Sequence, residues 1–300
     1  KDNIEKIPVL DDKIESFLPS PQAELVSGIV LGEKTQLPFS LKLALRDTST
    51  LHMVVVSGQN LTMLAGLVMR LSGFLTRKAA IALTVLAIVG YTLLTGADVP
   101  VLRAAAMAGL AYFAQIIGRQ SDGTWVMLIT AGLFLLINPS WIFDLSFQLS
   151  FLATVGVVVV APLVSSRLAG LPLFLRENLA VTLSAQALVT PVIASNFHQF
   201  SLVGVVANLL ILWTIPYIMV GGGVLLALSF LWSLPAQILS LGLNTLLTYF
   251  IYVVNFFASL PFAWEYVGEV WWIVWVGYYM VLTAIMLSLI YAKKEDSTGP

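Results

Sequence analysis

The sequence predicts an all-α protein, a polytopic bundle of transmembrane helices. Hydrophobic residues make up 59% of the 300 positions and charged residues only 10%, whereas soluble domains carry about 25% charged residues. The mean hydropathy is +0.93. The charges are also unevenly placed: residues 1–50 hold 14 of the 31 charged residues, and none lies between Asn178 and Trp264. We therefore expect a polar N-terminal segment followed by a membrane body.

The membrane body is expected to occupy residues 51–292, followed by a polar tail at 293–300. An apolar helix of about 20 residues spans the hydrocarbon core, so the chain has room for about 9–10 spans. The segment 202–232 is too long for one simple span and contains Pro216 and a glycine triplet, which predicts a broken helix there. The predicted spans are 53–74, 79–97, 99–118, 123–138, 144–164, 179–197, 202–232, 236–258 and 270–292.

Residues 1–50 are expected to form an amphipathic, interfacial segment. Residues 19–32 (PSPQAELVSGIVLG) and 38–49 (PFSLKLALRDTS) are its two helix candidates. In the second, Leu41, Leu43 and Leu45 alternate, which also fits a strand. Either segment is able to lie flat on a membrane surface.

Basic residues in the loops predict the orientation. Arg77-Lys78, Arg119 and the pair Arg167/Arg176 fall in alternate loops. Because Lys and Arg favour the cytoplasmic side, these loops are expected inside and residues 1–50 outside. The side of the C-terminus depends on whether 202–232 crosses once or twice, and both alternatives stay open.

The composition also limits the chemistry that we expect. The net charge is −1, Cys is absent, and His52 and His198 are the two histidines. This excludes disulfides and thiol chemistry and disfavours a multi-His metal site. We therefore expect no cofactor and no bound metal. The chain lacks an initiator Met, so we also expect it to be a fragment of a longer protein.

Arg103 is the most unusual residue of the membrane body. It lies in YTLLTGADVPVLRAAAMAGL, a stretch that otherwise reads as two spans joined by a tight turn. A guanidinium at membrane depth costs about 2.5–3.5 kcal/mol on insertion scales. Three alternatives explain it: it faces a hydrated passage and contacts an anion, it snorkels to the interface, or it pairs with Asp98 or Asp144.

Several predicted spans carry polar residues at helical spacing, which places them on one helix face. The simplest structural interpretation is that these residues form hydrogen bonds between helices, each of which stabilises the bundle by about 0.6 kcal/mol. Because four spans share the pattern, we favour a common hydrated cavity. The stripes are Ser57 and Asn60 after His52 in the first span, Asp144, Ser146, Gln148 and Ser150 in the fifth, Thr182, Gln186 and Thr190 in the sixth, and Gln237, Ser240, Asn244, Thr248 and Asn255 in the eighth.

Five motifs in order resemble the competence domain of the ComEC family, inner-membrane DNA channels of natural transformation. The resemblance covers residues 20–290, and the segment PSPQAELVSGIVLGE (19–33) resembles the family's sequence before that domain. Each motif alone is weak, but their order is specific. They are HMVVVSGQN (52–60), YTLLTGADVPVLRAA (91–105), GRQSD (118–122), NPSWIFDLSFQLSFLATVG (138–156) and TLSAQALVTPVIASNFHQFSLVGVVANLL (182–210).

The resemblance implies that the chain passes single-stranded DNA through the bacterial inner (plasma) membrane. Its expected partners are single-stranded DNA, the lipid bilayer and other proteins of the DNA-uptake machinery. The family's usual metallo-β-lactamase-like domain and its metal motif are not in this sequence, so we expect no nuclease activity. The candidate residues along the DNA path are His52, Ser57, Gly58, Asn60, Gly96, Arg103, Arg119, Asp122, Asn138, Asp144, Gln148, Ser150, Gln186 and Asn208.

Two other classes of function were weighed. A polytopic transporter of a small anionic solute or lipid shares the broken helix and the intramembrane polar groups. An intramembrane hydrolase would use Ser57, His52 and an Asp, but the sequence contains neither HExxH nor GxSxG. We therefore expect a conduit rather than an enzyme.

Overall fold

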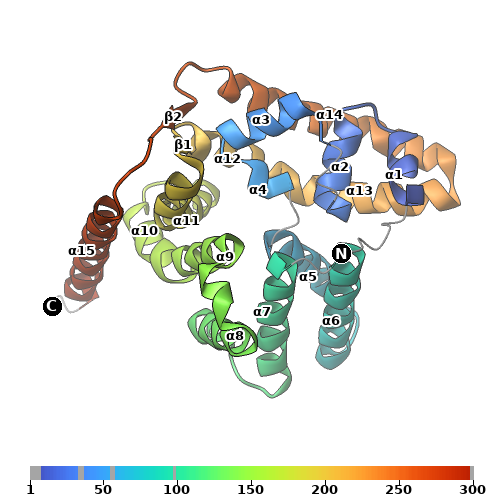
Figure 1. The fold of residues 1–300 in the computed structure, drawn as a ribbon. Coiled ribbons are helices and arrows are strands. Elements are labelled where there is room, and N and C mark those ends of the chain that lie inside the picture. Colours follow the sequence, from blue (N-terminus) through green and yellow to red (C-terminus); the bar gives the residue numbers. More distant parts are fainter. Residues whose placement is uncertain (1–7, 33–36, 55–57, 97–98, 298–300) are drawn as a thin grey trace. The chain divides into compact units, whose positions relative to one another are not determined.

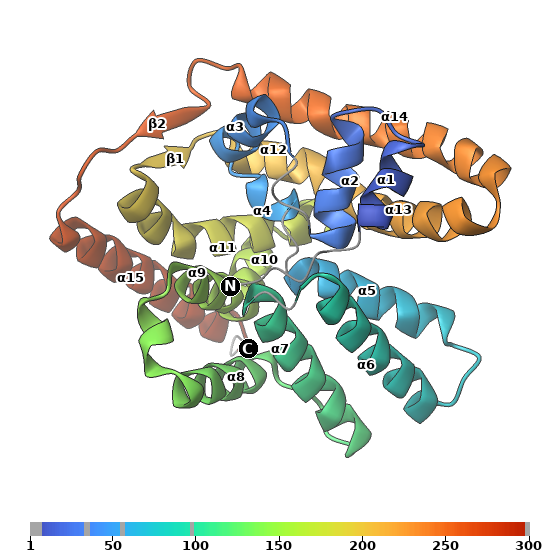
Figure 2. The same cartoon turned by 45° about the vertical axis from the view of Figure 1, so that its right-hand side comes forward.

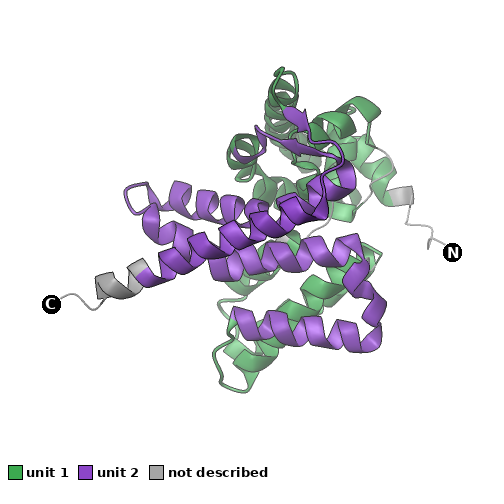
Figure 3. Cartoon of the chain, turned by 60° about the vertical axis from the view of Figure 1, so that its left-hand side comes forward, with its two compact units in different colours: residues 1–122, 206–263 green, residues 123–205, 264–300 purple. Residues whose placement is uncertain are grey.

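The computed structural model describes residues 8–32, 37–54, 58–96 and 99–297, and these are almost entirely helical (Figure 1). The chain divides into two compact units (Figure 3): unit 1 comprises Lys1–Asp122 and Val206–Ala263, and unit 2 comprises Gly123–Val205 and Trp264–Pro300. Each unit is therefore assembled from two separate stretches of sequence.

Unit 1 contains ten helices among the described residues, the eighth of which begins at the boundary with unit 2. They are α1 (Pro8–Glu15), α2 (Gln22–Leu31), α3 (Phe39–Asp47), α4 (Leu51–Val54), α5 (Gly58–Leu71), α6 (Arg77–Leu94), α7 (Val99–Ile116), α12 (Gly204–Ile211), α13 (Thr214–Leu231) and α14 (Ser233–Ala258).

Unit 2 combines helices with one small ladder of two strands. Its elements are α8 (Gly123–Ile137), the 3₁₀ helix η1 (Pro139–Phe143), α9 (Leu145–Val155), the π-helical turn η2 (Gly156–Val160), α10 (Ala161–Arg167), α11 (Leu173–Phe197), β1 (Gln199–Ser201), β2 (Trp264–Tyr266) and α15 (Trp272–Ser297). The strands β1 and β2 are antiparallel, with Phe200 opposite Glu265.

The predicted fold class is confirmed. Within the described residues, seven helical stretches are long and apolar enough to cross a membrane: α6, α7, the continuous run Leu145–Arg167, α11, α13, α14 and Trp272–Tyr291 of α15. The spans predicted at 53–74 and 123–138 correspond to shorter helices, α5 with 14 residues and α8 with 15. Since a helix rises 1.5 Å per residue, both helices as described fall short of a core of about 30 Å, and residues 55–57, which precede α5, lie outside the described residues.

The broken helix predicted within 202–232 is confirmed, and the break lies at Leu212-Trp213, between α12 and α13. Helix ends leave carbonyl groups without intrahelical partners. Here the Tyr249 hydroxyl of α14 donates to the Leu210 carbonyl at 3.1 Å, and the Thr214 hydroxyl donates to the Ile211 carbonyl at 2.6 Å. The break is thus satisfied by protein groups, as a break at membrane depth requires.

The glycine triplet at 221–223 does not break the helix, because it lies inside α13. Its middle residue instead permits a close approach of α2: a Cβ added at Gly222 would lie 2.8 Å from both Val26 Cγ1 and Val30 Cγ2. The same addition at Gly223 would meet nothing within 4 Å. One glycine of the triplet is therefore required by packing.

We expect Gly222→Ala to lower the free energy of unfolding by about 1–2 kcal/mol, because β-branched side chains such as Val26 and Val30 are stiff and overpacking strains the helix contact. Gly223→Ala, the matched control, is expected to be neutral or slightly stabilising through helix propensity. Denaturant titration in detergent measures the free energy of unfolding of both variants. Equal stabilities of the two variants would contradict this role of Gly222.

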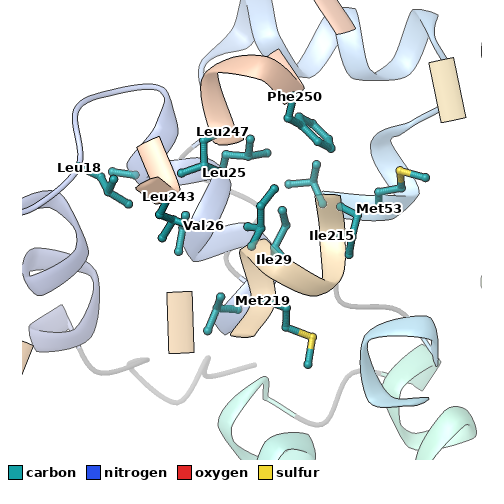
Figure 4. Close-up of a cluster of buried hydrophobic side chains, with 14 of the residues drawn as sticks. Leu18, Leu25, Val26, Ile29, Met53, Ile215, Met219, Leu243, Leu247 and Phe250 are labelled. Carbon is teal, nitrogen blue, oxygen red and sulfur yellow. The ribbon is translucent and has the colours of Figure 1, made fainter. Parts of the chain in front are cut away.

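The core of unit 1 forms around α2 (Figure 4). Leu25, Val26 and Ile29 have no exposed surface, and they pack with residues of α13 and α14 such as Ile215 and Phe250. A helix that is apolar all round is normally buried. The interfacial placement of residues 1–50 as a whole stays a prediction, but α2 is enclosed within the protein.

The segment 38–49 contains a helix, α3, which resolves the ambiguity left by its alternating leucines. Leu41, Ala44 and Leu45 are buried, while Lys42 and Arg46 are exposed. Apolar contacts at i, i+3 and i+4 are the helical pattern, and α3 uses that face to pack against α14.

Candidate functional site

Arg103 lies on α7 and is buried, with 1% of its surface exposed. Its helix packs against α5 and α6 (Figure 2). Small residues permit this close packing: Ala104 lies so near α5 that a Cβ added at Gly58 would be 3.1 Å from the Ala104 Cβ. The cation that was identified from the sequence is therefore held within a tight group of three helices.

The burial of Arg103 excludes one of the three explanations for this residue, namely that it snorkels to the interface. A guanidinium that snorkels to the interface keeps its charged head in contact with water, whereas Arg103 is enclosed. Asp98 lies outside the described residues, and Asp144 belongs to unit 2. Pairing with an aspartate and contact with an anion therefore stay as predictions for this residue.

Asn60 and Tyr91 converge on one backbone carbonyl in α2. Asn60, 1% exposed, donates from Nδ2 to the Ile29 carbonyl at 3.3 Å, and the Tyr91 hydroxyl of α6 donates to the same oxygen at 3.3 Å. This carbonyl lies in the last turn of α2, which ends at Gly32 in the left-handed conformation, φ 81°. Since the last carbonyls of a helix need partners from outside it, these side chains satisfy the end of α2 and join α5 and α6 to it.

We expect Asn60→Ala to lower the free energy of unfolding by about 1–2 kcal/mol, because it removes a hydrogen bond from a buried acceptor. Thr245→Ala is a suitable control, since the Thr245 hydroxyl is exposed and bonds only to the Leu241 carbonyl of its own helix, α14. Thermal unfolding of both variants in the same detergent tests this. If Asn60→Ala lowers the thermal stability no more than Thr245→Ala does, Asn60 does not join these helices.

Two predicted residues of unit 2 begin helices, and a third bonds back across the second helix start. Asn138 caps η1, since its Oδ1 accepts from the Ser140 backbone N–H at 3.1 Å and from the Ser140 hydroxyl at 2.7 Å. Asp144 is exposed and caps α9, where its Oδ1 accepts from the Phe147 N–H at 2.8 Å. Gln148 donates from Nε2 to the Ile142 carbonyl at 2.9 Å. The motif at 138–148 therefore folds into two successive helix starts, which are positions that favour Asn and Asp.

In the polar stripes, Thr248 of α14 accepts from Gln22 Nε2 of α2 at 3.0 Å, whereas the hydroxyls of Thr190 and Ser240, like that of nearby Thr154, bond inside their own helices. Thr154 donates to the Ser150 carbonyl at 2.8 Å, Thr190 to the Gln186 carbonyl at 2.7 Å, and Ser240 to the Gln237 carbonyl at 2.8 Å. This back-bonding to the preceding turn is common in helices. The bonds within a helix therefore neither join helices nor identify a passage, and the hydrated cavity stays a prediction.

Predicted residues at two helix ends have clear backbone roles. Gly96 has φ 83° just after α6, a left-handed conformation that favours glycine. At the end of α7, Gly118 has φ 78°, and the N–H of Arg119 donates to the Ala114 carbonyl at 2.9 Å. Arg119 and Asp122 are exposed. Both glycines therefore end their helices, and the second ending carries the charged groups of Arg119 and Asp122 at the surface.

The remaining predicted residues occupy separate places. His52, on α4, is exposed, and its Nδ1 donates to the Ser49 carbonyl at 2.8 Å. Asn208, on α12, is 8% exposed, and its backbone carbonyl accepts from the Leu212 N–H at the helix break. Gln186 is half-buried on α11, and Ser57 lies outside the described residues. The structure thus gathers Gly58, Asn60 and Arg103 on α5 and α7 of unit 1, and Asn138, Asp144, Gln148 and Ser150 along η1 and α9 of unit 2.

Tyrosines form the class of residue that the sequence reasoning missed. Tyr91, Tyr249, Tyr278 and Tyr279 each donate a hydroxyl to a backbone carbonyl of another helix. Their place inside apolar spans was the available signal, since a buried tyrosine hydroxyl usually has a partner. Which carbonyl each one reaches depends on contacts distant in sequence.

The described residues show no metal-binding chemistry. Among residues 8–32, 37–54, 58–96 and 99–297, no group of three or more His, Cys, Asp or Glu side chains is placed to hold a metal ion. The groups brought together in unit 1 are a cation, amides and phenols, which bind through hydrogen bonds and charge. Such groups suit recognition of an anion better than bond cleavage.

Comparison with known proteins adds an independent finding. A family model described as Competence protein matches residues 29–291. ComE operon protein 3 of Bacillus subtilis (strain 168) is 30% identical over 199 residues, which cover 65% of this chain and 25% of that protein. The uncharacterized protein YcaI of Escherichia coli (strain K12) is 27% identical over 282 residues, which cover 84% of this chain and 35% of that protein. The chain thus spans about a quarter to a third of the length of these relatives. No solved structure matches it.

Proposed function

Because the chain belongs to the Competence protein family, we propose that it forms part of a conduit for single-stranded DNA in the bacterial plasma membrane during natural transformation. The resemblance to the ComEC family is confirmed by the family match and by ComE operon protein 3. The observation that carries the proposal is the extent of that match, which runs through the whole series of membrane helices. Single-stranded DNA and other proteins of the uptake machinery are its proposed partners.

Two physical features support a conduit. A DNA strand carries one negative charge per nucleotide, so its passage needs a hydrated path with few, weakly binding groups. In unit 1, the buried cation Arg103 lies on α7, and the amide of Asn60 lies on α5, which packs against α7. In unit 2, the amide of Gln148 lies on α9. The proposed activity is transport and not catalysis.

The enclosed position of Arg103 adds a requirement. With 1% of its surface exposed, it is not accessible to a strand in this conformation. A conduit that uses Arg103 therefore requires a second conformation, in which the helices packed against α7, namely α5 and α6, move apart and expose this side chain. Passage and closure would then be two states of the same group of helices.

Site-specific photocrosslinking to incoming DNA tests the proposal. A transformable bacterium would carry, in place of its own competence protein, the full-length protein that contains this chain. A photoreactive amino acid would replace Gln148, which lies on the polar stripe of α9, or Leu136 of α8, which is 82% exposed and apolar. We expect labelled single strands to crosslink from position 148 and not from position 136.

Two outcomes would overturn the proposal. One is normal transformation in cells that lack the protein, accompanied by loss of uptake of a small anionic solute, which would favour the transporter alternative. The other is transformation without any crosslink from position 148, or crosslinks to duplex DNA alone.

A further inference from the structure

α11 contains a proline at a depth where backbone groups need partners. Pro191 lies inside the 25-residue helix α11 and is buried. Proline has no N–H, so the carbonyl four residues earlier, that of Ala187, loses its intrahelical donor. In a membrane such a freed carbonyl has to be satisfied by a neighbouring group.

Two tyrosines of α15 reach this part of α11. The Tyr278 hydroxyl donates to the Ala187 carbonyl at 2.9 Å, and the Tyr279 hydroxyl donates to the Leu188 carbonyl at 2.9 Å. The two bonds differ in one respect. By helix geometry the N–H of Val192 faces the Leu188 carbonyl, whereas the residue that would face the Ala187 carbonyl is Pro191. Tyr278 therefore supplies the donor that proline removes, and Tyr279 adds a second one.

α15 also packs against α10, but its apolar part is otherwise mostly exposed. None of the residues in its apolar window within Trp272–Tyr291 is buried. At its start, however, the chain is anchored: β1 pairs with β2, the Val267 N–H donates to the His198 carbonyl at 2.9 Å, and the His198 ring contacts the Gly268 carbonyl at 3.0 Å. Figure 3 shows the long helix α15 extending through unit 2 from this ladder.

The spacing along both helices fits two attachments of one unit. Ala187 lies eleven positions before His198 on α11, and Tyr278 lies ten positions after Gly268. At 1.5 Å per helical residue, Ala187 lies about 15 Å from the end of α11 at Phe197 and Tyr278 about 9 Å from the start of α15 at Trp272, with the non-helical residues 268–271 between the ladder and α15. α15 is thus attached to α11 at the ladder and again at the proline.

We propose that Pro191 and Tyr278 form a hinge and its latch: the proline weakens α11, and the Tyr278 hydroxyl holds α11 and α15 together by bonding the carbonyl that the proline frees. When the latch opens, α15 swings about the β1–β2 ladder and α11 bends at Pro191. The bond joins a hydroxyl and a carbonyl at 2.9 Å, so the latch depends on the separation of the two helices and not on an ion pair. This device concerns unit 2 alone and does not depend on the identity of what the membrane body carries.

A double-mutant cycle distinguishes this latch from ordinary packing. In Pro191→Ala, an N–H is restored and the Ala187 carbonyl regains its helical donor, so the Tyr278 hydroxyl becomes dispensable. The carbonyl of Leu188 has no such dependence on residue 191. Tyr279→Phe is therefore a matched control, which changes the same kind of side chain on the adjacent residue.

Spin labels report the separation of the two helices in the full chain, reconstituted in lipid nanodiscs. The chain contains no Cys, so labels attach only at introduced sites: Leu183→Cys on α11, 40% exposed, and Ile285→Cys on α15, 50% exposed. With Tyr278 and Pro191 present, electron–electron distance measurements should give one narrow population. Tyr278→Phe should add a longer, broader population.

The proposal is tested by comparing the effect of Tyr278→Phe with proline and with alanine at residue 191. Pro191→Ala combined with Tyr278→Phe should return the distances to one narrow population, while the change caused by Tyr279→Phe should be the same with either residue at 191. An unchanged distribution in Tyr278→Phe would overturn the latch. So would a broadening that Pro191→Ala fails to reverse, including one caused by unfolding.

Discussion

Replacing Gly156 with Ala is expected to destabilise unit 2 more than any other single change considered for this unit. A Cβ at position 156 would lie 2.6 Å from the Ser184 carbonyl oxygen, 2.8 Å from the Ala185 Cα and 2.9 Å from the Ala185 nitrogen. All three are backbone atoms of α11, so no side chain can rotate away to make room. The helices must separate, and we expect a loss of about 3 kcal/mol or more in the free energy of unfolding, the upper end for overpacking.

The position of Gly156 explains why the contact is so close. It starts the π-helical turn η2 in the middle of the continuous run Leu145–Arg167, where the polypeptide bulges toward α11. Glycine allows two helix backbones to touch, which is how transmembrane helices gain packing energy. The contact lies at Ser184–Ala185, two residues before the carbonyl that Tyr278 bonds.

Denaturant titration of the purified chain measures the loss, and Gly132→Ala provides the control. Gly132 lies in α8 of the same unit, is exposed, and would meet nothing within 4 Å on gaining a Cβ. That change is expected to be neutral or to stabilise by up to about 1 kcal/mol through helix propensity. A Gly156→Ala variant as stable as Gly132→Ala would show that the two helices are not packed at this glycine.

Replacing Arg103 with Met is expected to lower the transformation frequency by about tenfold or more, the change that corresponds to about 1.4 kcal/mol in a rate-limiting barrier. Met keeps much of the side-chain length and removes the charge. The reason follows from burial: a guanidinium with 1% of its surface exposed is retained only where the surrounding groups or a ligand use its charge. Colony counts after exposure to marked DNA, at matched protein level in the membrane, measure the effect.

Arg103→Lys separates charge from shape. Lysine keeps the positive charge but lacks the planar fork that binds phosphate or carboxylate through two parallel bonds. We expect an intermediate loss of transformation for Lys and a larger one for Met. Equal transformation by the wild type and Arg103→Met, with equal amounts of protein, would exclude a role of Arg103 in DNA entry.

The same pair of variants distinguishes a structural pin from a DNA contact. A cation that only pins a buried aspartate stabilises the fold, so Met would lower both the unfolding free energy and the protein level. If Arg103 contacts the DNA strand only when the conduit opens, its replacement by Met would leave the free energy of unfolding nearly unchanged. Thermal unfolding of the two variants, measured beside transformation, separates these results.

Part of the candidate site was predictable because its cause is local. Asn138 and Asp144 begin helices through bonds that reach two or three residues along the chain. Gly96 and Gly118 end helices through their own backbone angles. The break at Leu212-Trp213 follows from a segment too long for one span. Such features depend on residue type and spacing within one or two turns, which a sequence displays directly.

One expectation failed because a distant contact decided the outcome. The glycine triplet was expected to weaken a helix, but Gly222 serves the approach of α2, almost 200 residues away in the chain. The common cavity predicted from the polar stripes stays a prediction, because bonds such as that of the Thr190 hydroxyl to its own helix do not show which helix lies opposite. Periodicity settles neither point, because it identifies a helix face and not its neighbour.

The sequence by itself determined the class of the protein and its family. Hydropathy adds up residue by residue, so a chain that is 59% hydrophobic with long uncharged stretches has to place its helices in a membrane. Ordered motifs likewise identify a family without any structure. The tertiary structure alone decided that α2 is enclosed, that Asn60 and Tyr91 meet at the Ile29 carbonyl, and that Tyr278 reaches the carbonyl freed by Pro191. These contacts join residues 31 to 91 positions apart, and a partner for a backbone group exists only once two distant helices have packed together.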